Sequence, residues 1–232
     1  MNITLLHQLC EAPQARGIAV VIDVFRAFTV ACHAFGGGAD RYLLAPTSAV
    51  AARLAARHPD ALLVGKPEVG ASLRYHIPNS PTRLLEQPLT GRTIIHRTGA
   101  GVPGILAAAG ADEILTGALV NVGAIVRYLQ RSAPEHISLL VMGHEGSGAD
   151  LEDDLCARLI QARLAGEPFD LGPWRAQLRA GTGHYFFTEA EQEYPREDFD
   201  RCLALDRFDF VLRAELLGDH AQLHAVAVPP AR

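Results

Sequence analysis

The stretch GIAVVIDVFRAFTVACHAFGGG, residues 17–38, decides the fold class of this chain. Residues 17–24 form an apolar run that is typical of a buried strand, although it carries an acid at Asp23. Residues 26–35 follow directly with the composition of an apolar helix, which the glycines at 36–38 are expected to end. A strand that passes at once into a helix is the building unit of α/β proteins.

The same alternation continues along most of the chain and predicts a layered sheet with helices on both faces. The segment 66–90 interrupts it with a loop that contains four prolines, and long irregular segments of this kind are often functional. The patterns are weaker in the last third of the chain. Further strands are predicted at 41–45, 61–65, 92–96, 112–116, 136–142, 209–214 and 221–228. Further helices are predicted at 48–57, 103–109 and 120–131, after the GHEGSGADLEDD stretch (143–154) up to about residue 165, and near 174–180 and 197–204.

The composition excludes several classes of protein. The chain has 232 residues, of which 49% are hydrophobic and 20% charged, so it can bury a sizeable core and is not intrinsically disordered. No apolar run approaches the roughly 18–20 residues of a membrane-spanning helix. A net charge of −5 without a basic cluster argues against a nucleic-acid partner. The four cysteines form no CxxC pair and the first residues do not resemble a signal peptide, so a cytoplasmic location with reduced thiols is expected.

Two acidic segments follow predicted strands. Asp23 stands at the end of the first strand, where a carboxylate is costly unless it meets a metal, a cation or backbone donors. It could bind Mg²⁺ or attack phosphorus, or it could be a helix cap or a salt-bridge partner of Arg26. The stretch GHEGSGADLEDD (143–154) adds five acids, of which Glu145 is the least well explained by a helix start. Oxygen ligands without cysteine favour Mg²⁺ or Mn²⁺ over Zn²⁺.

Two further polar segments lie in predicted loops, and the first of them could bind an anion. HRTGAGVPGI (96–105) places small residues between a strand and a helix, where backbone N–H groups are exposed, and Arg97 could add a bidentate phosphate contact. An ordinary tight turn is the alternative. The Asn79-Ser80-Pro81 segment has the pattern of a helix start with Ser80 as the N-cap. Because ligands of α/β folds bind at the carboxyl ends of strands, these segments are expected to meet at one rim of the sheet.

Five segments of the chain occur in the order found in one family. The segments IDVFRAFT (22–29), NSP (79–81), HRTGAGVPGI (96–105), GALVNVGAIV (117–126) and GHEGSGADLEDDLCA (143–157) resemble motifs of the 2-phosphosulfolactate phosphatase (ComB) family, and the resemblance covers roughly residues 17–215. It implies a three-layer α/β/α fold with a mixed sheet, in a single domain over residues 1–232 that could have two lobes with the site between them. It also implies a Mg²⁺-dependent phosphatase that hydrolyses 2-phospho-3-sulfolactate to 3-sulfolactate and phosphate, a step toward coenzyme M.

The resemblance also implies which residues form the site. Catalytic roles fall to Asp23, Arg26 and Glu145, and metal binding to Asp23, Glu145, Glu152 and Asp153. Substrate binding falls to Arg97, Thr98, Gly101, Asn79, Ser80 and Asn121. The chain departs from the family pattern at Lys66, where members usually carry an acid.

The favoured hypothesis is a phosphatase in which an attacking oxygen, from water or from Asp23 itself, approaches phosphorus in line with the leaving group. Two alternatives stay open. One is a phosphatase for a different small phosphate ester. The other is a non-catalytic binding protein for a phosphorylated or sulfonated metabolite, which has lost an acid at Lys66. A homodimer is the default expectation for such an enzyme.

Overall fold

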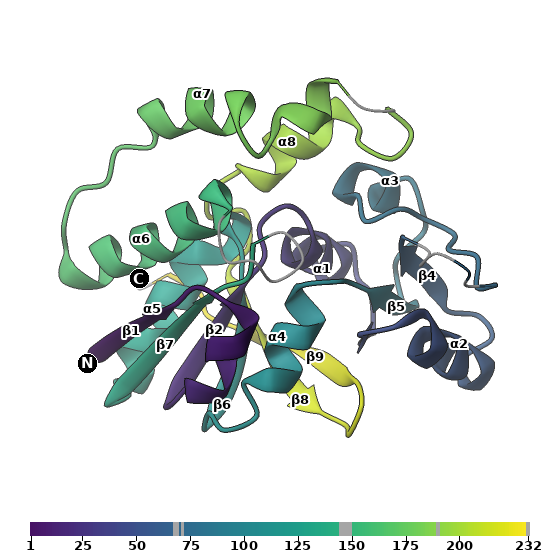
Figure 1. The fold of residues 1–232 in the computed structure, drawn as a ribbon, viewed down its shortest axis with the longest axis horizontal. Helices are drawn as coiled ribbons and strands as arrows, with labels where there is room; N and C mark the ends of the chain where they lie inside the picture. Colours follow the sequence, from purple (N-terminus) through teal and green to yellow (C-terminus); the bar gives the residue numbers. More distant parts are fainter. Residues whose placement is uncertain (67–69, 71, 144–149, 189–190, 231–232) are drawn as a thin grey trace.

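The computed structural model describes residues 1–66, 70, 72–143, 150–188 and 191–230. Within these residues the chain forms a nine-stranded sheet flanked by helices (Figure 1). The strands are β1 Asn2–Leu6, β2 Ile18–Ile22, β3 Arg41–Ala45, β4 Leu62–Gly65, β5 Thr93–Arg97, β6 Glu113–Gly117, β7 His136–Val141, β8 Phe210–Leu216 and β9 Ala221–Ala227. The helices are α1 Ala27–Gly36, α2 Ser48–Arg57, α3 Pro81–Leu85, α4 Gly101–Ala107, α5 Val122–Ser132, α6 Leu151–Ala165, α7 Gly172–Ala180 and α8 Arg196–Cys202, with 3-10 helices η1 Leu9–Gln14, η2 Leu119–Asn121 and η4 His184–Phe187.

Most of the predicted elements are present, with ends shifted by a few residues. The strand at 41–45 and the helix at 48–57 are confirmed at their predicted bounds. Thr47 caps this helix, because its side-chain oxygen accepts the N–H of Val50 at 3.3 Å. No helix among the described residues combines the length and the apolar character that crossing a membrane requires.

Two differences from the predicted elements have local causes. Helix α4 begins at Gly101, earlier than predicted, because the Thr98 hydroxyl accepts the N–H of Val102 at 3.1 Å and so satisfies a first-turn donor. Strand β1 is not predicted by the sequence pattern, since its five residues are partly exposed and form no long apolar run. It pairs in parallel with β7, where Ile3 lies opposite Ile137.

The sheet is mixed, in the order β1-β7-β2-β6-β8-β9-β3-β5-β4. Strands β1, β7, β2 and β6 are mutually parallel at one end, and β3, β5 and β4 are parallel at the other. The hairpin β8–β9 joins these two groups through three antiparallel pairings. The two parallel groups therefore run in opposite senses along the sheet.

Both faces of the sheet are buried, as the unbroken apolar run of β2 requires. Ala19 and Val21 pack into a core that contains residues of α1 and α4, whereas Val20 and Ile22 pack into a second core with α5 and α6. Helix α2 covers that second face at the far end of the sheet, against Leu43. The structure is thus the predicted three-layer α/β/α fold (Figure 1).

Because the two parallel groups run in opposite senses, the carboxyl ends of their strands do not lie along one edge of the sheet, as the prediction of a single rim requires. Five strand pairings separate β2 from β5. A twist of about 20–25° for each pairing accumulates to roughly 100–125° over this distance. The carboxyl ends of β2 and β7 are thereby turned toward those of β4 and β5 instead of pointing away from them. Loops from both groups can then contribute to one cavity.

Candidate active site

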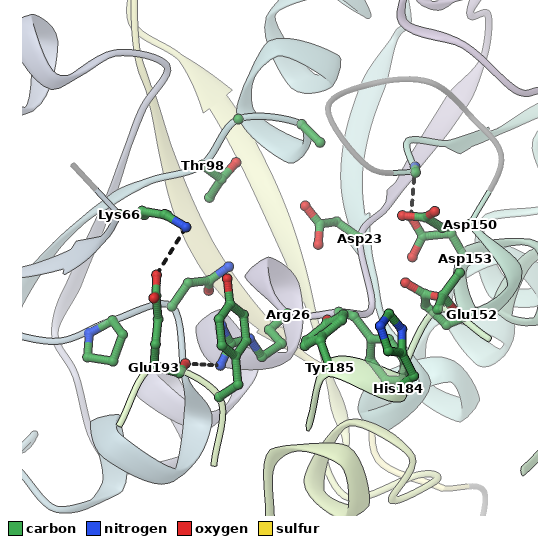
Figure 2. A pocket seen from close by; sticks show the side chains of 18 of the residues that line it. Asp23, Arg26, Lys66, Thr98, Asp150, Glu152, Asp153, His184, Tyr185 and Glu193 are labelled. Carbon is green, nitrogen blue, oxygen red and sulfur yellow. Dashed lines mark hydrogen bonds and ion pairs between the residues drawn. The ribbon is translucent and has the colours of Figure 1, made fainter. Parts of the chain in front are cut away.

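A cavity of about 700 Å³ lies where loops from three parts of the fold meet (Figure 2). One wall comes from the ends of β2 and β7 with the start of α6, a second from the loops after β4 and β5, and a third from residues within 181–194. Of the predicted site residues, the lining includes Asp23, Arg26, Asn79, Arg97, Thr98, Glu152 and Asp153.

Asp23 directly follows β2, and backbone groups fix its carboxylate. Its Oδ1 accepts the N–H of Ala27, at the start of α1, at 3.0 Å. Burial, together with the charge of the neighbouring Asp150, raises the pKa of Asp23 to about 6, although hydrogen bonds from Ala27 and Gly101 and the charge of Arg26 oppose the rise. The carboxylate is therefore largely ionised at neutral pH, at a place that favours a cation.

Two more buried carboxylates come from the first turn of α6. Glu152 accepts a hydrogen bond from the hydroxyl of Thr182. Asp153 accepts the N–H of Val24 at 2.7 Å and that of Gly143 at 3.0 Å, so its carboxylate connects the residues that follow β2 and β7. Burial raises the pKa of Glu152 to about 8 and raises that of Asp153 well above its usual range, and neighbouring carboxylates add to both increases.

Arg26 is buried against the third wall of the cavity. Its Nη1 donates to Oδ2 of Asp198 at 2.7 Å and to the backbone oxygen of Glu193 at 2.9 Å. The ring of Tyr194 lies 4.7 Å from its Cζ. Among the described residues the ion pair of Arg26 is thus formed with Asp198, and not with Asp23.

The turn between β5 and α4 approaches Asp23 closely. A Cβ at Gly101 would lie 2.8 Å from the ring of Phe28 and 3.0 Å from Oδ2 of Asp23, so the approach requires glycine. The backbone of Gly101 also donates to that carboxylate. Arg97 connects this turn to the loop after β4, because its Nη1 donates to the backbone oxygen of Lys66 at 3.4 Å.

The NSP segment divides between the cavity and the core. Asn79 lines the cavity, and its buried Oδ1 has no hydrogen-bond partner among the described residues. Ser80 is fully buried and caps α3, because its hydroxyl oxygen accepts the N–H of Arg83 at 3.1 Å. The helix-start interpretation of Ser80 is therefore confirmed, and its side chain does not belong to the described lining.

Three other predicted site residues, Gly101, Asn121 and Glu145, are not in the described lining. Asn121 is buried in the turn before α5, where its Oδ1 accepts the N–H of Ala118 at 3.3 Å and its Nδ2 donates to the backbone oxygen of Phe210 at 3.4 Å. With these bonds the Asn121 side chain joins the turn before α5 to β8. Glu145, predicted as a catalytic and metal-binding residue, lies outside the described residues.

The third wall is the part of the site that the sequence pattern does not predict. It contributes Thr182, His184, Tyr185, Glu193 and Tyr194. These residues lie on short turns and on the 3-10 helix η4, without apolar periodicity, and the dense aromatic run HYFF (184–187) is the one local signal. Across the cavity, the Nζ of Lys66 lies 3.3 Å from Oε1 of Glu193, and this contact raises the pKa of the ammonium (Figure 2).

The donor set fits Mg²⁺ in its chemistry. Asp23, Glu152 and Asp153 offer carboxylate oxygens in a buried place; the charge of Asp23 raises the pKa of Glu152 and of Asp153, and the charge of Glu152 raises that of Asp153. A hard cation would remove this repulsion. Within the described residues, no three acidic, histidine or cysteine side chains are arranged closely enough to hold one ion. Any metal would thus require these carboxylates to close around it.

Comparisons with known proteins identify the family of the chain. The family model of 2-phosphosulpholactate phosphatase matches residues 4–177. A probable 2-phosphosulfolactate phosphatase of Bacillus subtilis (strain 168) is 27% identical over 224 residues, which cover 96% of each chain. A protein with the same description from Symbiobacterium thermophilum is 34% identical over 151 residues, which cover 64% of each chain. Another from Synechocystis sp. is 30% identical over 174 residues, which cover 73% of this chain and 72% of the relative. The chain therefore belongs to the 2-phosphosulpholactate phosphatase family, which consists of phosphoric monoester hydrolases.

Proposed function

We propose that the protein is a Mg²⁺-dependent phosphatase for a small phosphate monoester, and that 2-phospho-3-sulfolactate, which the relatives' names describe, is its substrate. One observation supports this most strongly: buried carboxylates and arginines line the same cavity. Figure 2 shows Asp23, Glu152 and Asp153 on one side, with Arg26 closer to the opposite wall. A phosphate dianion between them can be held by the arginines, and a cation can join it to the acids.

The positively charged groups would bind the transferred phosphoryl group. Arg26 and Arg97 line the cavity from different loops, so they can contact different oxygens. Backbone N–H groups between Thr98 and Gly101 lie at the start of α4 and can donate to a third. Phosphoryl transfer depends mainly on such positioning and on stabilisation of the developing charge.

The carboxylates would supply the other half of the site. Asp23 and Glu152 would hold Mg²⁺, which when bound supplies charge neutralisation at the phosphate. Asp153 keeps the ends of β2 and β7 together, since both of its oxygens accept backbone N–H groups. Asp23 lies against the turn between β5 and α4, where its Oδ2 faces Gly101. An attacking oxygen, from water or from Asp23, would approach phosphorus on this side.

The test is release of inorganic phosphate from a panel of small phosphate monoesters that includes 2-phospho-3-sulfolactate, measured with Mg²⁺ and with EDTA. We expect release that requires the metal and that is fastest with an ester carrying a further anionic group. Release in EDTA at the same rate as in Mg²⁺ would contradict the metal dependence. Release from other esters, but not from phosphosulfolactate, would contradict the substrate and retain the phosphatase.

Lys66 decides how a negative result is interpreted. If a folded protein releases no phosphate from any ester but binds phosphosulfolactate, the function is metabolite binding, and the proposal of catalysis is wrong. Substituting Lys66→Glu would then show whether the charge change at this position is responsible. If the proposed phosphatase function is correct, the wild-type protein is active although it carries lysine at this position.

A further inference from the structure

The guanidinium of Arg26 is anchored through one nitrogen only. Nη1 makes both of its recorded hydrogen bonds, to Asp198 and to the backbone oxygen of Glu193. Among the residues that the structure describes, Nε and Nη2 have no hydrogen-bond partner, and neither is one of the fully buried polar atoms that lack a partner. These two nitrogens form the side of the guanidinium fork that best matches two phosphoryl oxygens. Since Arg26 lines the cavity, this side remains accessible from it.

The anchor itself is rigid. Asp198 is fully buried on α8, and its second oxygen, Oδ1, accepts the N–H of Thr82 in α3 at 2.9 Å. The carboxylate is therefore held from a separate element before it contacts Arg26. The rings of Tyr194 and Phe186 lie 4.7 and 5.6 Å from the Cζ of Arg26 and restrict the plane of the guanidinium.

We infer that Asp198, with the ring of Tyr194, is a positioning residue that fixes Arg26 so that its Nε–Nη2 side binds two oxygens of the substrate phosphate. Both residues lie beyond residue 177, where the match to the family model ends. The inference rests on the proposed phosphatase function for its kinetic consequences, but the binding of inorganic phosphate tests it independently.

The alternative is that the Arg26–Asp198 pair only stabilises the fold, as many buried ion pairs do. The two roles differ in what they predict for phosphate. A stabilising pair affects the free energy of unfolding without changing affinity for an anion in the folded protein. A positioning residue changes affinity and turnover even where the protein is fully folded, because misplacement by about 1 Å can cost roughly 100-fold in rate.

The experiment compares Asp198→Asn with Asp200→Asn, a matched control on the same helix. Asp200 also pairs with an arginine, Arg175, but this pair is exposed. We expect D198N to lower kcat/KM for the phosphate ester by roughly 10- to 100-fold and to weaken binding of inorganic phosphate, measured by calorimetry, by about 10-fold, while D200N stays close to wild type. A folded D198N that equals D200N in both measurements would overturn the inference.

Chemical rescue keeps the test valid if D198N folds poorly, because it uses variants without the arginine. We expect guanidinium at millimolar concentration to restore activity to Arg26→Ala, in which Asp198 can still orient the added ion, but not to the double variant R26A/D198N. Equal rescue of the two variants would contradict a positioning role. If no ester is hydrolysed at all, the proposed function fails, and the phosphate affinities of D198N and D200N alone decide the inference.

Discussion

Replacing Glu152 by glutamine tests whether the buried carboxylates destabilise the metal-free protein. Burial raises the pKa of Glu152 from 4.5 to about 8, and the nearby carboxylates of Asp150 and Asp23 contribute. The unfolded chain loses this proton near pH 4.5, whereas the folded chain keeps it to about pH 8. Between these values the folded state binds more protons than the unfolded state, so the free energy of unfolding falls as the pH rises.

The size of the effect follows from the same difference. One pH unit corresponds to about 1.36 kcal/mol, so Glu152 can account for a loss of up to about 5 kcal/mol between pH 4.5 and pH 8. The contribution is complete below the lower value and absent above the higher one. Glutamine carries no charge and can still accept the hydrogen bond from Thr182, so E152Q removes the ionisation with little change in packing.

The measurement is urea denaturation in EDTA at several pH values between about 5 and 8. We expect the wild type to lose several kcal/mol over this range and E152Q to lose distinctly less, so that E152Q is the more stable protein near pH 8. Glu167→Gln, at an exposed site just after the same helix, should follow the wild type. If E152Q showed the wild-type slope, or were less stable than the wild type near pH 8, the reasoning about this cluster would be refuted.

Three further outcomes are expected. Millimolar Mg²⁺ should raise the unfolding free energy of the wild type by mass action, about 2.7 kcal/mol at 100 times the dissociation constant, and Asp23→Asn should lose most of this gain in calorimetric melts. Asp153→Ala should cost roughly 1–3 kcal/mol for each of the two backbone N–H groups that it leaves unpaired, which urea denaturation measures; an unchanged midpoint would show that water replaces the carboxylate. Gly101→Ala should lower kcat by about 10-fold or more, because its Cβ would displace Phe28 or Asp23, whereas Gly110→Ala, which meets nothing closer than 3.9 Å, should retain activity; equal rates would contradict the close approach.

The sequence predicts those parts of the site that follow strongly apolar strands. Asp23 is conspicuous because a carboxylate at the end of a buried strand requires a partner, and the structure supplies backbone donors and a cavity. Glu152 and Asp153 are adjacent on a helix, where residues in sequence point about 100° apart. Both line the cavity because α6 begins at Leu151, so they lie in its first turn, and Asp153 also bonds the ends of β2 and β7.

Other parts depend on long-range packing that local patterns do not encode. Asp198 has the appearance of an ordinary acid in the first turn of a helix, and nothing in its neighbourhood reveals the ion pair with Arg26, which is distant in sequence. The residues of the third wall lie on irregular turns and on the short 3-10 helix η4. The reversed sense of the β4–β5 group arises from the hairpin β8–β9 at the end of the chain, which inserts between strands that precede it. Asn121 belongs to a recognisable motif, but its amide is used to join backbone segments.

Whether Asp23 takes part in the reaction is decided by the rate of phosphate release from 2-phospho-3-sulfolactate in Mg²⁺, compared between the wild type, Asp23→Asn and Asp60→Asn. Asp60 is exposed and does not line the cavity, so D60N controls for the loss of one carboxylate. We expect D23N to be slower by at least about 100-fold, as when one preorganised charged group of an active site is removed, and D60N to match the wild type. A folded D23N that releases phosphate at the wild-type rate would show that the reaction does not take place at these carboxylates.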